Sequence, residues 1–329
     1  MEKVKALVFN SYGGLEKLHF DDINIPGPKK DEVLIKVHAA SINAGDFIVL
    51  KGEPAMMRIA TGIFSPRFSI LGHDLSGVVV QLGSEVHDLK VGDAVYGPIP
   101  LFHNGSFVEY LCIPSSYMAK KPESMSFEEA AAIPLAGLTA LQCLRDYRAP
   151  PKSAEDKYKV MIHGASGGVG SYAIQIAKDL GYEVTAVCST RNVDKARQFG
   201  ADKVIDYKKE SPFEGSESKY DIVFAANGDN SISSYTKLLK NGGVFSTCGG
   251  SGRQNFQAMI HGAVLSRGKV FFHSFQPNRK DLEYIGSLFE SKKLDANVDK
   301  VFPKDQIVDA LRYFSEGKSQ GKVVIKMVD

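Results

Sequence analysis

A glycine-rich run, Gly164-Ala165-Ser166-Gly167-Gly168-Val169-Gly170, is the part of the sequence with the clearest chemistry. It follows an apolar stretch typical of a strand, 160–163, and leads into a stretch with apolar residues at helical spacing, 167–180. The first N–H groups of a helix have no acceptor within the helix, and glycines leave them open to an anion. The run therefore predicts a dinucleotide site in which Gly167, Gly168 and Val169 contact the pyrophosphate. A tight strand–helix turn that binds nothing is the alternative.

The end of the next predicted strand, 182–187, bears on which nucleotide is bound. An NAD site usually has Asp or Glu there, which accepts a hydrogen bond from the ribose 2′-hydroxyl. Here the strand is followed by Cys188-Ser189-Thr190-Arg191, without a carboxylate. Arg191 can donate a charge-assisted pair of hydrogen bonds to a 2′-phosphate, and Ser189 can donate another. We therefore expect NADPH to be preferred over NADH. A solvated Arg191 at a helix start is the alternative.

The elements around this turn alternate between strand and helix from about residue 159 onward. Such alternation predicts a parallel sheet covered by helices on both faces, the doubly wound Rossmann arrangement. The predicted strands are 160–163, 182–187, 204–206, 221–224, 243–247 and 269–272, and the predicted helices are 167–180, 192–199, 231–240, 254–265 and 279–291.

The N-terminal part has the pattern of a β domain. Short apolar or alternating runs at 5–9, 32–38, 76–81 and 106–112 are separated by turn signals, which favours a barrel or a sandwich. A helix is predicted to begin after Ser126, because Ser126 and Glu129 have the spacing of a capping box. The final run, 321–327, is again typical of a strand and can return to this first domain.

Composition excludes several classes of protein. Of the 329 residues 43% are hydrophobic and 24% are charged, with a net charge of +2, which argues against a nucleic-acid binder acting through its overall charge. No apolar run reaches the ~20 residues of a transmembrane helix, and residues 1–9 lack the apolar core of a secretory signal. The four cysteines form no CxxC pair, which favours a reducing compartment. We expect a soluble, cytoplasmic protein, with an organelle left open.

Five motifs in order give the chain a family resemblance. They are Ser41-Ile42-Asn43-Ala44-Gly45-Asp46, the run 71–79 around Gly72-His73-Asp74, Val91-Gly92-Asp93-Ala94-Val95, the run 130–140 that ends Gly137-Leu138-Thr139-Ala140, and the glycine turn. With them the chain resembles the medium-chain dehydrogenase/reductase superfamily, in its quinone oxidoreductase (zeta-crystallin-like) branch. The resemblance implies an α/β protein. A GroES-like β-barrel domain, 1–125, is completed by 292–329 and joined to a Rossmann NADP-binding domain, 126–291.

The resemblance also implies further cofactor contacts. Asn43 and Thr139 would approach the nicotinamide, Tyr207 the adenosine phosphate, and Lys322 would reach the site from the returning tail. Asn227, Gly249 and Gly250 would line the sheet edge beside the cofactor. Simpler roles remain open, since Asn43 and Thr139 can cap local turns and Tyr207 can cover a strand end. The resemblance further implies a homodimer, joined through an edge strand for which 243–250 is the candidate.

His73 raises the question of a metal. Zinc-containing members of the superfamily have a cysteine where Asn43 stands, and the cysteine-rich lobe of some relatives is missing here. A catalytic zinc needs three protein ligands, which one histidine does not supply. We therefore expect no metal, with His73 as a hydrogen-bonded residue at a strand start.

The chemistry expected without a Lewis acid is reduction of a conjugated acceptor. Hydride can add to the β-carbon, and the charge then spreads to a distant oxygen as an enolate, which an amide N–H of Asn43 can hold. The predicted function is NADPH-dependent reduction of α,β-unsaturated carbonyls or quinones, with no proton donor identified. Ile48 stands where some quinone-reducing relatives have tyrosine, which weighs against a quinone. The alternatives are a zinc-free alcohol dehydrogenase or carbonyl reductase, and a non-catalytic nucleotide-binding regulatory protein.

Overall fold

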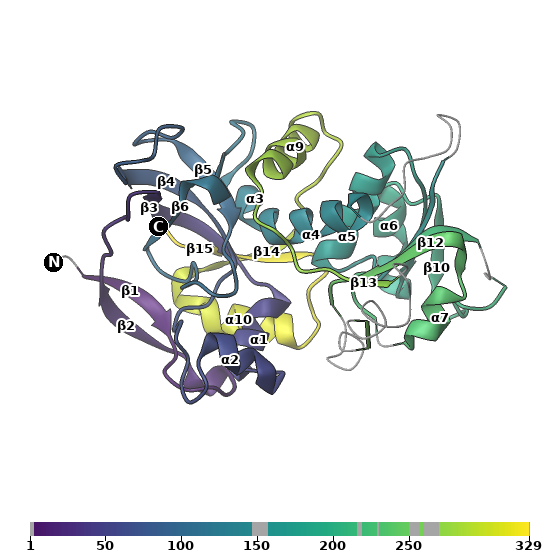
Figure 1. The fold of residues 1–329 in the computed structure, drawn as a ribbon, viewed down its shortest axis with the longest axis horizontal. Coiled ribbons are helices and arrows are strands. Elements are labelled where there is room, and N and C mark those ends of the chain that lie inside the picture. The colour runs from purple at the N-terminus through teal and green to yellow at the C-terminus, as the bar shows by residue number, and fades with distance from the viewer. Residues whose placement is uncertain are drawn as a thin grey trace. The chain divides into compact units, whose positions relative to one another are not determined.

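The computed structural model describes residues 3–146, 157–215, 219–228, 230–249, 257–258 and 270–328. The chain divides into two compact units (Figure 1). The first comprises residues 1–135, 277–290 and 296–329, and the second comprises residues 136–276 and 291–295.

A mostly antiparallel sheet organises the first unit. In the described part of the chain it has seven strands, of which six follow the order β14-β15-β3-β4-β5-β7 while β6 pairs with β3. These strands are β3 (Glu32–Ser41), β4 (Asp74–Leu82), β5 (Ala94–Pro98), β6 (Tyr110–Pro114), β7 (Ala119–Lys120), β14 (Val298–Pro303) and β15 (Lys322–Lys326). A separate hairpin pairs β1 (Lys3–Val8) with β2 (His19–Asn24).

The returning C-terminal strand completes this sheet, as the sequence predicts. β15 pairs antiparallel with β3, with Val324 opposite Ser41, and parallel with β14. Because β3 is buried along most of its length, its apolar residues and those of β15 share one core. The pairing brings Lys322 to the end of β3, where the chain leaves the sheet.

Helices attached to the first unit are α1 (Ala44–Lys51), α2 (Arg58–Thr61), α3 (Phe127–Ala132), α9 (Arg279–Glu290) and α10 (Ile307–Ser315). The predicted capping box is confirmed at α3, where Glu129 N donates to Ser126 Oγ at 3.1 Å and Ser126 N donates to Glu129 Oε2 at 2.8 Å. The hydroxyl of Tyr96 on β5 donates to the carbonyl of Leu282 at 2.7 Å, which holds α9 in this unit. The domain boundaries that the family resemblance implies, 126–291, group α3 and α9 with the Rossmann domain; these boundaries stay a prediction.

The second unit contains a parallel sheet, which confirms the predicted Rossmann arrangement. Its described strands follow the order β10-β9-β8-β11-β12-β13, and all of their pairings are parallel. The strands are β8 (Lys159–His163), β9 (Glu183–Cys188), β10 (Lys203–Asp206), β11 (Tyr220–Ala225), β12 (Leu239–Thr247) and β13 (Val270–Phe272). The strand order reverses between β8 and β11, and ligands of such sheets bind beyond the carboxyl ends at that point.

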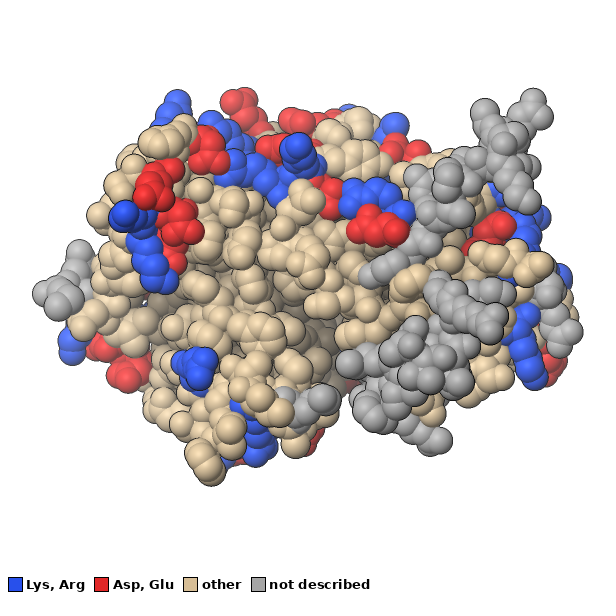
Figure 2. All heavy atoms as spheres, in the orientation of Figure 1, with Lys and Arg blue, Asp and Glu red and all other residues tan. Residues whose placement is uncertain are grey.

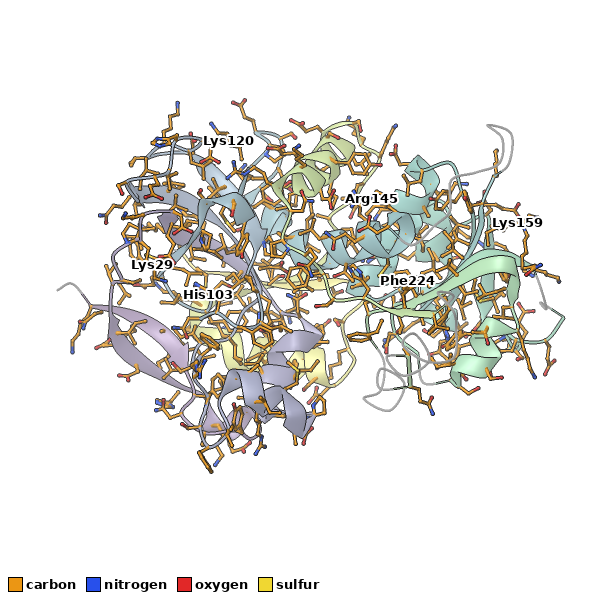
Figure 3. All side chains as sticks on the ribbon, viewed as in Figure 1. Lys29, His103, Lys120, Arg145, Lys159 and Phe224 are labelled. Carbon is orange, nitrogen blue, oxygen red and sulfur yellow. The ribbon has the colours of Figure 1, made fainter. Side chains whose placement is uncertain are left out.

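Among the described residues, the helices of this unit with defined bounds are α5 (Gly168–Asp179), α6 (Val193–Gln198), α7 (Ile232–Thr236) and most of α4 (Pro134–Arg145). Strand β8 begins with Lys159 at the surface, whereas Phe224 of β11 is fully buried in the sheet (Figure 3). The helix predicted over 231–240 ends early, because β12 already begins at Leu239. The helix predicted over 254–265 lies almost wholly outside the described residues.

One expectation about the sheet is wrong. The run 243–250 was the candidate edge strand for a dimer, but β12 pairs with β11 on one side and with β13 on the other. Residues 245–247 are therefore paired on both sides within the described sheet, and β12 is not its edge strand.

The surface of the described residues agrees with the balanced composition. On the face drawn in Figure 2, basic and acidic side chains are interspersed and neither sign forms a continuous patch. Within the described ranges, no helix has both the length and the apolar character needed to cross a membrane.

Candidate functional site

Asn43 lies at the junction between β3 and α1, and its backbone is fixed from both sides. Its N–H donates to Asp46 Oδ2 at 2.7 Å, and its carbonyl accepts from the N–H of Asp46 at 3.1 Å. The residue has extended dihedral angles, φ −132° and ψ 159°, which suit a helix N-cap. This local exchange of bonds ends the strand and begins the helix, so the side chain of Asn43 projects from a rigid corner.

The side chain of Asn43 meets Lys322. Lys322 Nζ donates to Asn43 Oδ1 at 2.6 Å, while Asn43 Nδ2 donates to Asp74 Oδ2 at 2.8 Å and to the carbonyl of Ser41 at 3.3 Å. The structure thus brings together two residues of the predicted site that are 279 positions apart. Both amide hydrogens of Asn43 are engaged in these bonds. To donate to an enolate, as predicted, Asn43 would have to exchange one of them.

Two buried carboxylates that sequence reasoning did not assign support this corner. Asp74 is fully buried and accepts from Ser41 Oγ at 2.8 Å, from Asn43 and Lys322, and from the N–H of Leu135 at 2.7 Å. Asp46 is also fully buried and accepts from the N–H of Gly72 at 2.7 Å. Asp46 and Asp74 both lie in motifs that carry the family resemblance, and each is a charged residue among apolar neighbours. This placement is the sequence feature from which they could have been predicted.

Burial shifts the ionisation of this cluster. It raises the pKa of Asp46 above its ordinary value, although His73 and the N–H groups of Asn43 and Gly72 act in the opposite direction. Burial lowers the pKa of Lys322, against the opposing influence of Asp74.

His73 lies beside Asp46 but is not hydrogen-bonded as expected. Its Nε2 is 3.6 Å from Asp46 Oδ1, and within the described chain neither ring nitrogen has a hydrogen-bond partner. The described ranges also hold no group of three or more His, Cys, Asp or Glu side chains placed to bind a metal ion. The metal-free site remains a prediction.

In the second unit, predicted site residues follow the carboxyl ends of five parallel strands. Because those ends share one edge of a parallel sheet, the residues gather there. The glycine turn follows β8, Ser189 and Arg191 follow β9, Tyr207 follows β10, Asn227 follows β11 and Gly249 follows β12. Thr139 lies on α4 and is buried, and Gly250 lies outside the described residues.

Packing does not require a glycine at position 167 of the glycine turn. A Cβ on Gly170 would lie 2.2 Å from the carbonyl of Gly164, and Gly164 itself has φ +78° with Asn227 backbone against it. Gly167 is the N-cap of α5 with ordinary dihedral angles, φ −72° and ψ 173°. A Cβ there would meet nothing nearer than 3.5 Å. The space before the first N–H groups of α5 is therefore open, which fits a pyrophosphate.

The loop after β9 carries the residues predicted to select the nucleotide. Ser189 precedes a short 3₁₀ turn, Thr190–Asn192, and its Oγ accepts from Asn192 Nδ2 at 3.1 Å. Arg191 is exposed, and Tyr207 is 50% exposed, with its N–H donating to the carbonyl of Cys188 at 3.1 Å.

Asp206 is a carboxylate near this loop, and it was not among the site residues predicted from the sequence. Strand pairing places it opposite Cys188, just before Ser189. The Thr190 hydroxyl is the largest influence that holds the pKa of Asp206 below its ordinary value, and the N–H of Lys208 donates to it at 3.1 Å. Only the parallel pairing of β9 with β10 reveals this proximity.

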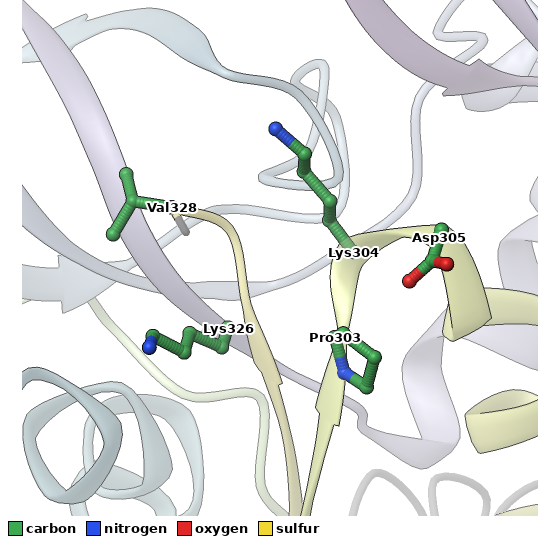
Figure 4. Close-up of a pocket in the computed structure, with 5 residues that line it drawn as sticks. All are labelled: Pro303, Lys304, Asp305, Lys326 and Val328. Atoms are coloured by element: carbon green, nitrogen blue, oxygen red, sulfur yellow. The ribbon is translucent and has the colours of Figure 1, made fainter.

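His163, the last residue of β8, adjoins the glycine turn. Its Nδ1 lies 2.6 Å from the hydroxyl of Tyr235, and burial lowers the pKa of His163 to about 4. The imidazole is therefore neutral at physiological pH. A separate surface pocket of about 400 Å³ contains none of the predicted site residues; it is lined by Pro303, Lys304, Asp305, Lys326 and Val328 (Figure 4).

Comparison with known proteins places this architecture in a family. Residues 29–123 match the alcohol dehydrogenase GroES-like domain, and residues 199–325 match a family described as zinc-binding dehydrogenase. His73, the histidine considered above as a zinc ligand, lies outside the residues that match the zinc-binding dehydrogenase family. The expected GroES-like domain is thereby confirmed.

Relatives cover nearly the whole chain. The chloroplast envelope quinone oxidoreductase homolog of Arabidopsis thaliana is 32% identical, over 98% of each chain. The 2-methylene-furan-3-one reductase of Solanum lycopersicum is 34% identical, over 98% of this chain and 79% of the relative. The solved quinone oxidoreductase from Coxiella burnetii has a TM-score of 0.86 and 31% identity, over 99% of this chain and all of that one. The chain belongs to the medium-chain dehydrogenase/reductase superfamily, among the quinone oxidoreductase homologues, as the resemblance predicted.

Another relative, the chloroplastic NADPH-dependent alkenal/one oxidoreductase of Arabidopsis thaliana, is 34% identical over 98% of this chain and 80% of its own. Its name states the cofactor and the acceptor class predicted above. The predicted enzyme class, an oxidoreductase of this superfamily, is confirmed.

Proposed function

We propose that this protein transfers a hydride from NADPH to α,β-unsaturated carbonyl compounds or to quinones. One observation carries the proposal: Gly167 leaves open space before the first N–H groups of α5, although neither its dihedral angles nor its packing require a glycine. The names of the relatives support the reaction class, since they include a quinone oxidoreductase homolog and an alkenal/one oxidoreductase.

Residues of the second unit would hold most of the cofactor. The N–H groups of Gly168 and Val169, at the positive end of α5, would bind the pyrophosphate. Arg191 and Ser189 would bind the 2′-phosphate by charge-assisted hydrogen bonds. Tyr207 would cover the adenosine, Thr139 would approach the nicotinamide, and Asn227, Gly249 and Gly250 would line the adjoining sheet edge.

Residues of the first unit would act near the reacting atoms. The cofactor, when bound, supplies the hydride, and the protein supplies orientation and a site from which water is excluded. Asn43 would contact the nicotinamide end, and Lys322 would support it through the 2.6 Å bond to its amide oxygen. We assign no general acid, so the proton that completes the reduction would come from solvent or from a cofactor hydroxyl.

We also propose that the reaction uses no metal. The family position of a zinc-ligating cysteine is Asn43, whose amide is bonded to Asp74 and Lys322, and the imidazole of His73 faces Asp46. Stoichiometric zinc in the purified protein would contradict this. Homodimerisation and a cytoplasmic location stay predictions from the sequence.

Turnover assays test the proposed function. The purified protein would be mixed with NADPH or NADH and with a short enone, a benzoquinone or a simple aldehyde, and nucleotide oxidation followed by absorbance. We expect turnover of the enone or the quinone, with NADPH preferred. Reduction of the aldehyde alone would indicate a carbonyl reductase. Tight NADPH binding without turnover would indicate a regulatory nucleotide-binding protein.

A further inference from the structure

Asp74 is a fully buried carboxylate whose two oxygens are both occupied. Oδ2 accepts from Ser41 Oγ at 2.8 Å, from Asn43 Nδ2 at 2.8 Å and from Lys322 Nζ at 3.3 Å, and Oδ1 accepts from Leu135 N at 2.7 Å. Lys322 is 3% exposed, so the ion pair is shielded from water. A buried ion pair is a costly way to stabilise a fold, because apolar side chains of similar volume often do as well. Stability alone therefore gives little reason for it.

The pair has a consequence for the amide of Asn43. The amide lies between an anion and a cation, with Nδ2 toward Asp74 and Oδ1 toward Lys322. The flipped amide would place oxygen against carboxylate and NH₂ against ammonium, which is electrostatically unfavourable. The ion pair therefore allows Asn43 a single orientation.

That orientation decides what Asn43 offers a ligand. Both amide hydrogens are used, by Asp74 and by the carbonyl of Ser41. The carbonyl oxygen of an amide has two lone pairs, and Lys322 takes one of them. What remains is one acceptor position on Oδ1. Its partner must be a donor, such as the carboxamide N–H or a ribose hydroxyl of the nicotinamide end, and an enolate oxygen does not fit.

We propose that Asp74 and Lys322 are positioning residues: they lock Asn43 so that its Oδ1 accepts a hydrogen bond from the nicotinamide end of NADPH. The inference rests on the proposed function and deepens it, because it replaces the predicted donor role of Asn43 by an acceptor role. Neither Asp74 nor Lys322 touches the reacting atoms; both act through Asn43.

A double-mutant cycle on kcat tests whether they act through Asn43. Asn43→Ala, Lys322→Met and the double variant would be compared at saturating NADPH with the best acceptor. We expect kcat to fall about a hundredfold in N43A and about tenfold in K322M. In the double variant we expect kcat within about twofold of N43A, because residues that act as a unit are not additive. Multiplied losses, near a thousandfold, would overturn the inference.

Stability measurements separate positioning from loss of structure. K322M should lower the melting temperature in both the wild-type and the N43A backgrounds. Its effect on kcat, by contrast, should disappear in the N43A background. Tyr96→Phe is the matched control, since it removes a buried hydrogen bond to Leu282 far along the chain from Asn43. Y96F should lower the melting temperature and leave kcat unchanged. If K322M does not fold, the charge-neutral pair Asp74→Asn with Lys322→Met enters the same cycle with the same expectations.

The reduced 3-acetylpyridine analogue of NADPH tests the acceptor role. It has a methyl group where the carboxamide has NH₂, so it cannot donate to Oδ1 of Asn43. If the carboxamide is the donor, the loss of kcat/KM in N43A should shrink from about a hundredfold to less than about threefold with the analogue. The acceptor role would be overturned if N43A lost as much kcat/KM with the 3-acetylpyridine analogue as with NADPH, and also lost as much with an NADPH analogue that lacks the hydroxyl of the nicotinamide ribose. A wild-type protein that oxidises no NADPH would instead contradict the proposed function itself.

Discussion

The ammonium of Lys322 lies 2.6 Å from the amide oxygen of Asn43, across 279 residues of chain. The contact exists because β15 pairs antiparallel with β3, which brings the start of the last strand to Asn43, two residues beyond the end of β3. Neither residue is then free to rotate, since Asp74 bonds to both. The returning tail thus completes a polar corner as well as a sheet.

Gly167→Ala should separate ligand binding from folding. A Cβ at this position meets no protein atom nearer than 3.5 Å and the dihedral angles suit alanine, so we expect unfolding free energy to change by less than about 1 kcal/mol. The same Cβ would stand before the N–H groups of α5, and NADPH affinity should fall at least about tenfold. Calorimetric titration and thermal melting measure the two effects.

Gly170→Ala is the contrasting variant. Its Cβ would lie 2.2 Å from the carbonyl of Gly164 and 2.7 Å from the Cα of Ala165, so backbone must shift. We expect a loss of several kcal/mol of stability, in the range of other severe packing errors. A G170A protein as stable as the wild type would show that the turn is not packed as described.

Arg191→Ala should change the choice between nucleotides. Loss of a charge-assisted pair of hydrogen bonds costs about 1.5–3 kcal/mol, so the Kd for NADPH should rise about ten- to a hundredfold. The Kd for NADH, which lacks the 2′-phosphate, should stay within about twofold. Arg197→Ala is a suitable control, because Arg197 forms an exposed ion pair with Asp194 on α6. Equal losses for both nucleotides would refute the role of Arg191.

Lys322→Met should destabilise the protein more than the double replacement does. The single variant leaves Asp74 buried without its counter-ion, which typically costs about 3–5 kcal/mol. Asp74→Asn combined with K322M removes both charges and should recover part of that loss. Urea unfolding of the three proteins gives the comparison, and a double variant less stable than K322M would contradict it.

The local elements around the glycine turn were accessible from sequence, because glycine conformation, apolar periodicity and capping are properties of neighbouring residues. The strand at 160–163, the helix at 167–180 and the Ser126 cap all follow from such patterns, and the structure has them at β8, α5 and α3. The family motifs added the first unit and the return of the last strand to it.

What remained hidden depends on pairing between distant segments. Asp206 comes near Ser189 only because β10 pairs with β9, and the bonds of Asp74 depend on where β3, α4 and β15 meet. The placement of α9 depends on bonds between distant segments, from Tyr96 to the carbonyl of Leu282 and from Arg279 to the carbonyl of Met118, which no periodicity reveals. Likewise β12 was taken for an edge because its sequence does not tell which strand lies beyond it.

The buried imidazole of His163 should make stability depend on pH. Burial lowers its pKa in the folded protein to about 4, below the ordinary value of 6.5, so between these values the unfolded chain binds more protons than the folded one. Stability is then fully present above pH 6.5 and is lost as the pH falls toward 4, by at most about 3 kcal/mol for this residue. His163→Gln keeps a polar side chain beside Tyr235 but does not titrate. Urea unfolding between pH 4 and pH 7 should therefore show a shallower decline for H163Q than for the wild type, and parallel curves would mean that His163 is protonated alike in both states.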